Sequence, residues 1–444
     1  MASGDTHFDR ESAERAVALA VSKGASEVKA WGSWATHVEL SQREGEIEKS
    51  TEATTQGLSL SLLVDDRFSS HSTSDLRPDA LEAFIDKAVS ATRYLEPDPE
   101  RRMLDRDQMG AIDRGPLELE DPGFDGVDPA LRQQRVGELE AAVKARNPGD
   151  LVSATAHIWA ARSETRVVFS NGFAADAAST SFGLGAEATI REESGKLPEG
   201  YSFYSARHLG DVPGVDLVAD ELWERINSVR DAGPCESGRY AMILPGRAAG
   251  RILSTTLGPL SGGAIWQGRS LFQDKLGERI ASEKLTVYSD QTLARGMGSH
   301  SFDGDGQAAT RRTIIEDGVL KTFLLDVYHA RKLDRAPTSG RLANVVVPPG
   351  ERSHEAIAAS FPRAIRVDAF VGGNANSTTG DFSFGIRGQL LENGVPVKNL
   401  SEMNISGNLV DLLAGFAEAG NDPWLWSSYR VPTLLFEGVQ FSGT

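Results

Sequence analysis

Apolar residues recur at helical and at strand spacing in separate parts of the N-terminal region. Positions three and four apart predict amphipathic helices over Arg10–Lys23 and Pro78–Arg93. Between them, alternation of apolar and polar residues predicts strands at Glu27–Trp34, Thr36–Arg43 and Gly57–Val64. This part of the sequence therefore predicts a helix, paired strands and a second helix.

The next part of the sequence repeats this order. Residues 96–128 are rich in Pro, Asp, Glu and Arg and predict a linker. Helices are predicted at Pro129–Ala145 and Gly214–Arg230. Between them, strands are predicted on both sides of an Asn171-Gly172 hairpin turn: 151–162, 164–170 and a strand pair over 175–191. The shared order of the two units indicates a weak internal repeat.

From about residue 234 the chain consists mainly of short apolar runs and Gly-rich turns. Glu316-Asp317-Gly318 and Glu392-Asn393-Gly394 each lie between apolar runs, which is typical of β-hairpins. We therefore predict an α+β protein with helix-flanked α/β units in the N-terminal half and a large, mainly antiparallel β domain after them. The predicted domains are 1–110, 111–233 and 234–444.

One longer helix interrupts the C-terminal half. The apolar run Tyr240–Leu244 predicts a buried strand, and Gly246–Gly263 then places its apolar residues on one helical face. We expect the helix to end at Gly258-Pro259, because glycine accepts a left-handed C-terminal turn and proline cannot continue the hydrogen-bond ladder.

This strand and helix resemble the core of the TldD/PmbA family, long named modulators of DNA gyrase. In the TldD branch the helix carries H-E-x-x-x-H, the signature of a zinc metalloprotease. Leu253 and Gly258 match the leucine before the motif and the glycine inside it. Ser254 and Thr255 then replace the first histidine and the glutamate, and Pro259 replaces the second histidine. Zinc requires imidazole, thiolate or carboxylate ligands, so this helix has none of the ligands that the family uses.

The remaining ligand of the family, a cysteine near the C-terminus, is also missing, because the only cysteine of the sequence is Cys235. The chain therefore resembles the PmbA (TldE) branch, which pairs with TldD. The N-terminal half resembles the family only in its layout. The resemblance is closer over roughly residues 240–444, where further segments match: 301–306, 315–320, 328–333, 338–340, 380–383, 392–394, 405–409 and 420–422.

The charge balance narrows the range of partners. The net charge is −17 and the sequence pI is about 5.0, whereas a protein that holds a nucleic-acid backbone needs clustered Lys and Arg. No apolar run is long enough to predict a membrane span, and the polar N-terminus lacks the apolar region of a secretion signal. We therefore expect a cytoplasmic protein that binds neither nucleic acid nor membrane.

Other polar clusters have a structural explanation that we favour. His354-Glu355 begins like a zinc-binding helix, but no second histidine follows at ligand spacing, which favours a solvated helix start. Asp303–Gly306 and Thr378–Asp381 could form an acid–base or cation site, yet tight turns use the same residues. Ser254 lacks the G-x-S-x-G context of a nucleophile, which favours a serine on a helix face.

The resemblance implies a non-catalytic PmbA/TldE-like subunit of a heterodimeric TldD/PmbA-type zinc metallopeptidase. The TldD-like partner would carry the zinc, and this chain, without catalytic or metal-binding residues of its own, would shape a chamber for a peptide or small amide substrate. The chamber candidates are Asn376, Thr379, Asp381 and Phe382. The candidates for the interface, where large aromatic and apolar side chains are common, are Leu257, Ile265, Trp424 and Trp426.

Two alternatives remain open at this point. One is a standalone homodimeric binding or scaffold protein that has lost the chemistry. The other is an unconventional enzyme with a rebuilt site in the same place.

Overall fold

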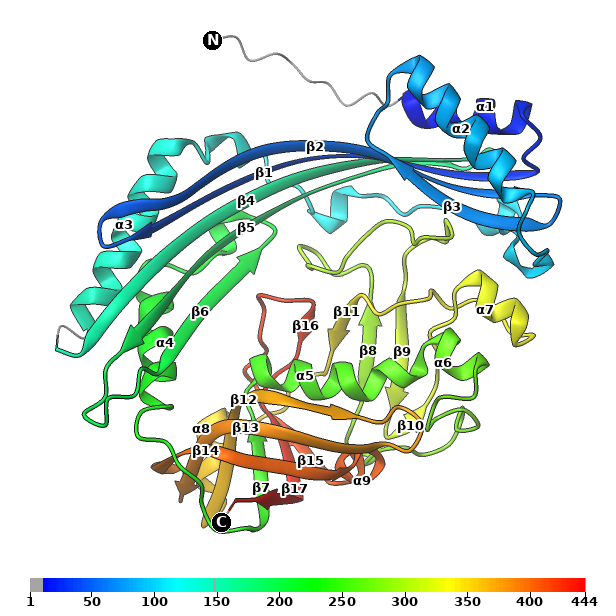
Figure 1. Cartoon of the computed structure of the whole chain (residues 1–444). Helices are drawn as coiled ribbons and strands as arrows, with labels where there is room; N and C mark the ends of the chain where they lie inside the picture. Colours follow the sequence, from blue (N-terminus) through cyan, green and yellow to red (C-terminus); the bar gives the residue numbers. More distant parts are fainter. Residues whose placement is uncertain (1–10, 147–148, 444) are drawn as a thin grey trace.

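The computed structural model describes residues 11–146 and 149–443 and contains three β-sheets with helices around them (Figure 1). Arg10, where the first helix was predicted to begin, and the polar residues before it lie outside the described residues. The mixture of helices and mainly antiparallel sheets confirms the predicted α+β class.

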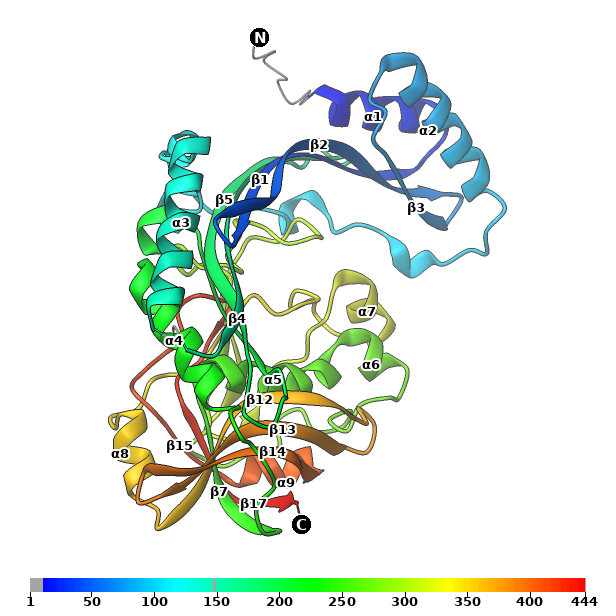
Figure 2. The same cartoon turned by 60° about the vertical axis from the view of Figure 1, so that its left-hand side comes forward.

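The N-terminal half forms one six-stranded antiparallel sheet, the arched sheet, in the order β3-β2-β1-β4-β5-β6. Its strands are β1 (Glu27–Arg43), β2 (Glu46–Val64), β3 (Arg67–Thr73), β4 (Leu151–Phe169), β5 (Ala174–Ile190) and β6 (Glu199–Ala206). Two helices cover each end of the sheet (Figures 1 and 2). They are α1 (Glu11–Ser22) and α2 (Pro78–Thr92) at one end, and α3 (Pro129–Arg146) and α4 (Val215–Asn227) at the other.

The predicted internal repeat is visible in the element order. Each unit consists of a helix, three strands and a helix, and the strand order is mirrored about the β1–β4 pair. This pair runs from Lys29 opposite Phe169 to Arg43 opposite Thr155. The two units therefore share one sheet, and the predicted boundary between residues 110 and 111 falls in the segment that connects them.

The strands of the arched sheet are longer than the sequence pattern predicted. The expected breaks at residues 35 and 163 are wrong, because Ala35 pairs with Thr55 on one side and with Ser163 on the other. The expected strand pair over 175–191 is one strand, β5. The exposed first part of β2 is also in the sheet, since its backbone pairs with β1 although its side chains face solvent. Pairing by backbone hydrogen bonds does not require an apolar pattern.

The connection between the two units matches the predicted linker. It contains only short 3-10 turns: η1 (Pro99–Arg101), η2 (Arg106–Gln108), η3 (Gly115–Leu117) and η4 (Phe124–Gly126). Leu117 and Phe124 are buried, and Phe124 packs against Val38, Ala160 and Phe182 of the sheet.

The C-terminal half contains the other two sheets. A six-stranded sheet has the order β14-β13-β12-β7-β17-β15 and closes on itself through an additional β14–β17 pairing. A five-stranded sheet has the order β10-β9-β8-β11-β16. The strands of the closed sheet are β7 (Gly238–Leu244), β12 (Arg363–Ala375), β13 (Asp381–Glu392), β14 (Val395–Asn408), β15 (Phe416–Ala419) and β17 (Leu434–Ser442). Those of the five-stranded sheet are β8 (Val287–Asp290), β9 (Arg311–Glu316), β10 (Val319–Leu320), β11 (Asn344–Val346) and β16 (Tyr429–Arg430).

Both predicted hairpin turns of this half are confirmed. Asp317 and Gly318 have φ values of 48° and 78° between β9 and β10. Asn393 and Gly394 have φ values of 48° and 81° between β13 and β14. Positive φ at two successive residues is the requirement that Asp-Gly and Asn-Gly satisfy at low cost.

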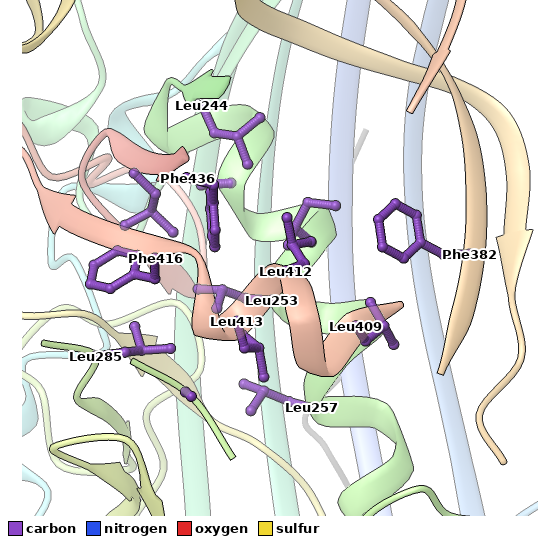
Figure 3. Packing of buried hydrophobic residues seen from close by; sticks show 14 of the residues in the cluster. Leu244, Leu253, Leu257, Leu285, Phe382, Leu409, Leu412, Leu413, Phe416 and Phe436 are labelled. Carbon is purple, nitrogen blue, oxygen red and sulfur yellow. The ribbon is translucent and has the colours of Figure 1, made fainter. Parts of the chain in front are cut away.

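The main hydrophobic core lies in the C-terminal half. Figure 3 shows Leu253 and Leu257 in the same cluster as Leu409, Leu413 and other buried residues. The helices of this half are α5 (Gly246–Leu257), η6 (Gly258–Leu260), α6 (Gly262–Trp266), α7 (Val327–Lys332), α8 (His354–Ala359) and α9 (Leu409–Ala414). Within the described residues, no helix has the length and apolar character needed to span a membrane.

Candidate functional site

Helix α5, which corresponds to the predicted motif helix, lies on the side of the closed sheet that faces the arched sheet (Figure 1). Its inner face is buried, including Ala249, Ile252 and Leu253. Two glycines allow a close approach of the C-terminal segment on another side. A Cβ on Gly246 would lie 2.1 Å from the carbonyl oxygen of Val431, and one on Gly250 would lie 3.3 Å from Cβ of Tyr429. Packing on several sides thus holds α5 in place.

The hydroxyl groups at the motif positions bond to their own helix. Ser254 Oγ and Thr255 Oγ1 each donate a hydrogen bond of 2.9 Å to the carbonyl oxygen of Arg251. A neutral hydroxyl used in this way is a poor zinc ligand, and proline at 259 has no side-chain donor atom. The residues at these positions therefore do not fit a zinc ion. Ser254 is the helix-face serine that the sequence predicted.

The end of α5 differs in detail from the prediction. The α-helix ends at Leu257 as expected, but Gly258 has φ −54° and ψ −46°, which is right-handed. The chain continues directly into the 3-10 turn η6, in which Pro259 is buried. Proline is compatible with the first turn of a helix, so Gly258-Pro259 tightens the helix instead of reversing the chain.

Three of the four chamber candidates form the turn between β12 and β13. Asn376 Oδ1 accepts hydrogen bonds from the backbone N–H groups of Thr378 (2.9 Å) and Thr379 (3.3 Å). The Asp381 carboxylate accepts from Thr379 Oγ1 (2.8 Å) and from Asn408 Nδ2 (3.1 Å). These bonds are those of a tight turn, as favoured from the sequence. A role of these exposed residues in substrate binding stays a prediction.

The fourth chamber candidate, Phe382, belongs to the core. Only 6% of Phe382 is exposed, and its ring stacks on Phe384 with centroids 5.6 Å apart. The prediction that Phe382 lines a chamber does not fit this burial, because side chains alternate along β13 and residue 382 points inward.

Two of the interface candidates are also buried in the core of this chain. Leu257 is 1% exposed and Ile265 is 3% exposed, so neither has side-chain area to offer to a partner in this conformation. The apolar residues that suggested an interface are explained by the packing of α5 and α6 within the chain.

Trp424 and Trp426 connect the two halves of the chain. Their rings lie 4.9 Å apart and pack on Tyr204 of β6, at 5.1 Å and 4.9 Å. Trp426 Nε1 donates to the carbonyl oxygen of Asp211 (3.0 Å). Both rings thus contribute to an internal contact, and a further role at a subunit interface stays a prediction.

Charged residues surround these rings and form what we call the α4 junction. The Arg247 guanidinium lies 4.4 Å from the Trp424 ring centroid and donates to the Phe203 carbonyl oxygen (2.7 Å) and to Glu221 (3.4 Å). Nearby, Arg366 of β12 pairs with Glu224 of α4 (3.2 Å). The first turn of α5 and the strand β12 are therefore both bonded to α4, one of the two helices that cover this end of the arched sheet.

His354 at the start of α8 differs from its prediction. The helix start is confirmed, with Ser353 as the N-cap residue. The imidazole is not solvated, however: Nδ1 lies 3.1 Å from Thr433 Oγ1, and burial lowers the pKa of His354, assisted by the nearby Arg366. The ring is therefore held neutral in the folded protein.

This burial predicts a pH dependence of stability. A histidine with a lowered folded-state pKa resists a proton that the unfolded chain accepts, so the free energy of unfolding will fall as the pH falls below about 6.5. His354→Asn will make this fall less steep than in the parent protein. Urea unfolding between roughly pH 5 and pH 8 measures both slopes. Equal slopes for the parent protein and His354→Asn would contradict the assignment.

A cavity of about 430 Å³, here called the inner cavity, lies between the arched sheet and the C-terminal half. It is lined by residues from separate parts of the chain: Trp31, His300, Phe302, Asp303, Gly304, Asp305, Asp326, Ser339, Gly340 and Arg341. Lys29 of β1 forms an ion pair with the lining residue Asp305: its Nζ lies 2.6 Å from Asp305 Oδ1. The turn predicted at 303–306 is present, since Asp303 Oδ1 accepts from the backbone N–H of Asp305 (2.9 Å). The sequence identified this turn and the 338–340 segment separately but not their meeting.

Comparison with known proteins identifies the family. Residues 237–443 match the PmbA/TldA metallopeptidase C-terminal domain, and residues 33–92 match domain 1 of the same group. The chain is 27% identical to the metalloprotease PmbA of Escherichia coli O157:H7 over 92% of this chain and 90% of that protein. It is 25% identical to the PmbA homolog of Haemophilus influenzae over 98% and 96% of the two chains.

Solved structures agree with these matches. A Bacteroides thetaiotaomicron protein described as a modulator of DNA gyrase superposes with a TM-score of 0.93 at 33% identity, covering 99% of this chain and 100% of that one. The TldE structure from Thermococcus kodakarensis has the same fold, with a TM-score of 0.86 at 19% identity over 97% and 100% of the two chains. The architecture is thus that of a PmbA/TldD-type, metalloprotease-like protein. The chain belongs to the PmbA/TldD family.

Proposed function

We propose that this chain is the non-catalytic, PmbA/TldE-like subunit of a heterodimeric zinc metallopeptidase. A TldD-like partner with an intact H-E-x-x-x-H helix supplies the zinc and the chemistry. This chain completes the chamber that holds a peptide or small amide substrate.

The state of helix α5 carries this proposal. The helix is packed on both its core face and its glycine face, yet its motif positions hold Ser254, Thr255 and Pro259. Within the described residues, no group of three or more His, Cys, Asp or Glu side chains is arranged to hold a metal ion. A scaffold that is retained while its ligand positions are changed is the pattern expected of a subunit that acts through a partner.

Co-expression with a TldD-like chain tests the proposal directly. Size-exclusion chromatography with light scattering should give a one-to-one complex, and only fractions that contain both chains should cleave a peptide substrate. If the chains elute separately and the TldD-like chain is fully active alone, the heterodimer is wrong. A homodimer of this chain without activity would then favour the binding or scaffold protein.

A second prediction concerns metal and the motif serine. The chain purified alone will contain well below one zinc per chain by elemental analysis, because its motif positions offer no ligand set. In the reconstituted complex, Ser254→Ala will leave kcat/KM within about twofold, while alanine in place of the first motif histidine of the partner will abolish cleavage. Stoichiometric zinc, or a large loss with Ser254→Ala, would indicate a rebuilt catalytic site in this chain.

A further inference from the structure

Part of the outer edge of the arched sheet is not covered by another strand. Strand β3 pairs with β2 only from Leu58 to Val64. Residues 46–57 of β2, here called the free edge, pair with β1 on one side. On the other side, no element of the described chain pairs with them. The free edge lies on the side of the sheet away from β6 and the C-terminal half (Figure 1).

The hydrogen bonds of β1 show which backbone groups of the free edge point outward. Val28 N–H donates to Ser170 Oγ (3.0 Å), and its carbonyl oxygen accepts from Ser170 N–H (2.9 Å), so Val28 points its backbone groups toward β4. These directions alternate along a strand, so odd-numbered residues of β1, such as His37 opposite Ala53, bond to β2. The even-numbered residues of β2 in this part therefore point their N–H and C=O groups out of the sheet: Ser50, Glu52, Thr54 and Gln56.

The side chains of the free edge do not prevent another strand from pairing with it. Natural sheets protect their edges with charges, prolines, bulges or a covering loop. Here Lys49 Nζ lies 2.7 Å from Glu39, and Glu52 lies 3.4 Å from Arg132, so both charges have partners within the chain. Residues 53–57 are uncharged, and neither a proline nor a register shift interrupts residues 49–57. An unprotected edge of this kind is expected to be covered by a second strand.

The limits of the free edge favour the same strand of a second copy as the cover. The edge lies between the turn at Gly45 and the end of β3, where Thr73 pairs with Leu58. Thr51 is near its middle, so two antiparallel β2 strands that meet with Thr51 opposite Thr51 both fit between these limits. Ser50 then faces Glu52 and Lys49 faces Ala53, so no like charges lie opposite each other.

We propose that the free edge binds a second copy of this chain, through antiparallel β2 strands related by a two-fold axis at Thr51. Such a contact is closed, because each copy uses the same surface. The two arched sheets then form one continuous sheet across the dimer. This inference uses only the geometry of this chain and does not rest on the proposed function.

Cysteine cross-linking of the full chain tests the pairing and its register. The backbone groups of Thr51 point toward β1, so the two Thr51 residues form a non-hydrogen-bonded pair with Cα atoms about 4.5 Å apart, which a disulfide can span. In Thr55→Cys, on the same face of the strand, the two cysteines lie eight residues apart along the pair, roughly 26 Å. With diamide as the oxidant, Thr51→Cys should give at least about tenfold more cross-linked dimer than Thr55→Cys. The parent protein, whose Cys235 is buried, gives the background.

A proline variant tests whether backbone hydrogen bonds hold the two copies together. Thr54→Pro removes an N–H that points outward and has no partner within the chain, so the pairing of β2 with β1 is kept. Size-exclusion chromatography with light scattering should give a dimer for the parent protein and a dissociation constant at least about tenfold higher for Thr54→Pro. Thr54→Ala is the matched control: it also loses the hydroxyl that lies 3.3 Å from Thr36 Oγ1, but it keeps the N–H and should remain dimeric. Thermal melts by circular dichroism verify that each variant is folded.

The outcomes separate this inference from the proposed function. A monomeric parent protein overturns the pairing, and so does equal cross-linking of Thr51→Cys and Thr55→Cys. A dimer that persists unchanged in Thr54→Pro places the contact elsewhere and also overturns it. If Thr51→Cys cross-links but no complex with a TldD-like chain forms, only the proposed function falls. If an active heterodimer forms and Thr51→Cys does not cross-link, only the pairing of the free edge falls.

Discussion

Leu253→Ala will destabilise the C-terminal half by about 3 kcal/mol, whereas Ser254→Ala in the adjacent position will change stability by less than about 0.5 kcal/mol. Leu253 is 1% exposed and lies in the main core, so its truncation leaves a cavity (Figure 3). Ser254 Oγ donates to the carbonyl oxygen of Arg251 on its own helix, and that carbonyl also accepts from Thr255. The two substitutions compare two positions on one helix: Leu253, which packs in the core, and Ser254, which stands where the TldD branch has a zinc ligand.

Differential scanning calorimetry measures both effects. For a unit of roughly 150–250 residues, a loss of 3 kcal/mol corresponds to a fall in Tm of about 6–12 °C. Ser254→Ala should melt within about 2 °C of the parent protein. A large effect of Ser254→Ala together with a small effect of Leu253→Ala would show that α5 is not retained for packing, and would favour a functional role for the serine.

Arg247→Met will weaken the contact between the two halves of the chain by about 3 kcal/mol. The methionine retains much of the apolar stem but leaves Glu221 and the Phe203 carbonyl oxygen without the guanidinium, and removes the cation over Trp424. Arg239→Met is the matched control, because exposed Arg239 donates, among the described residues, only to the Gly438 carbonyl oxygen (2.8 Å). It should cost less than about 0.5 kcal/mol.

The readout should separate local loosening from general unfolding. In Arg247→Met the arched sheet and the C-terminal half should melt in two distinguishable transitions, and protease cleavage between α4 and β7 should accelerate. A double-mutant cycle with Glu221→Gln should give a coupling energy above about 0.5 kcal/mol. Unchanged melting and proteolysis in Arg247→Met would mean that the aromatic contacts of Tyr204, Trp424 and Trp426 hold the α4 junction without the charges.

The α4 junction and the inner cavity bear on the proposed chamber. Both use side chains of the arched sheet together with side chains of the C-terminal half, so the two halves are fastened at separate places. Attachment at two separate places fixes the position of one half relative to the other, and so fixes the shape of the space between them. In the proposed heterodimer, this chain would therefore offer its partner and the substrate a preformed wall.

The sequence alone was sufficient wherever a short segment contains the cause of its own conformation. Asp317-Gly318 and Asn393-Gly394 form the predicted hairpin turns because those residues accept positive φ locally. Helical spacing located α1 to α5 within a few residues. The loss of family ligands at Ser254, Thr255 and Pro259 is also a property of residue identity, and no tertiary contact alters it.

The tertiary structure decided whatever depends on residues far apart in the sequence. Ala35 continues β1 because β2 and β4 pair with it, not because of its neighbours in the chain. Leu257 and Ile265 look like interface residues in sequence but are buried by α9 and other elements of the core. The inner cavity exists only because β1, the 300–305 loop, the start of α7 and the 339–341 loop meet in space. Composition and periodicity describe one segment at a time, whereas burial is set by which segments pack against each other.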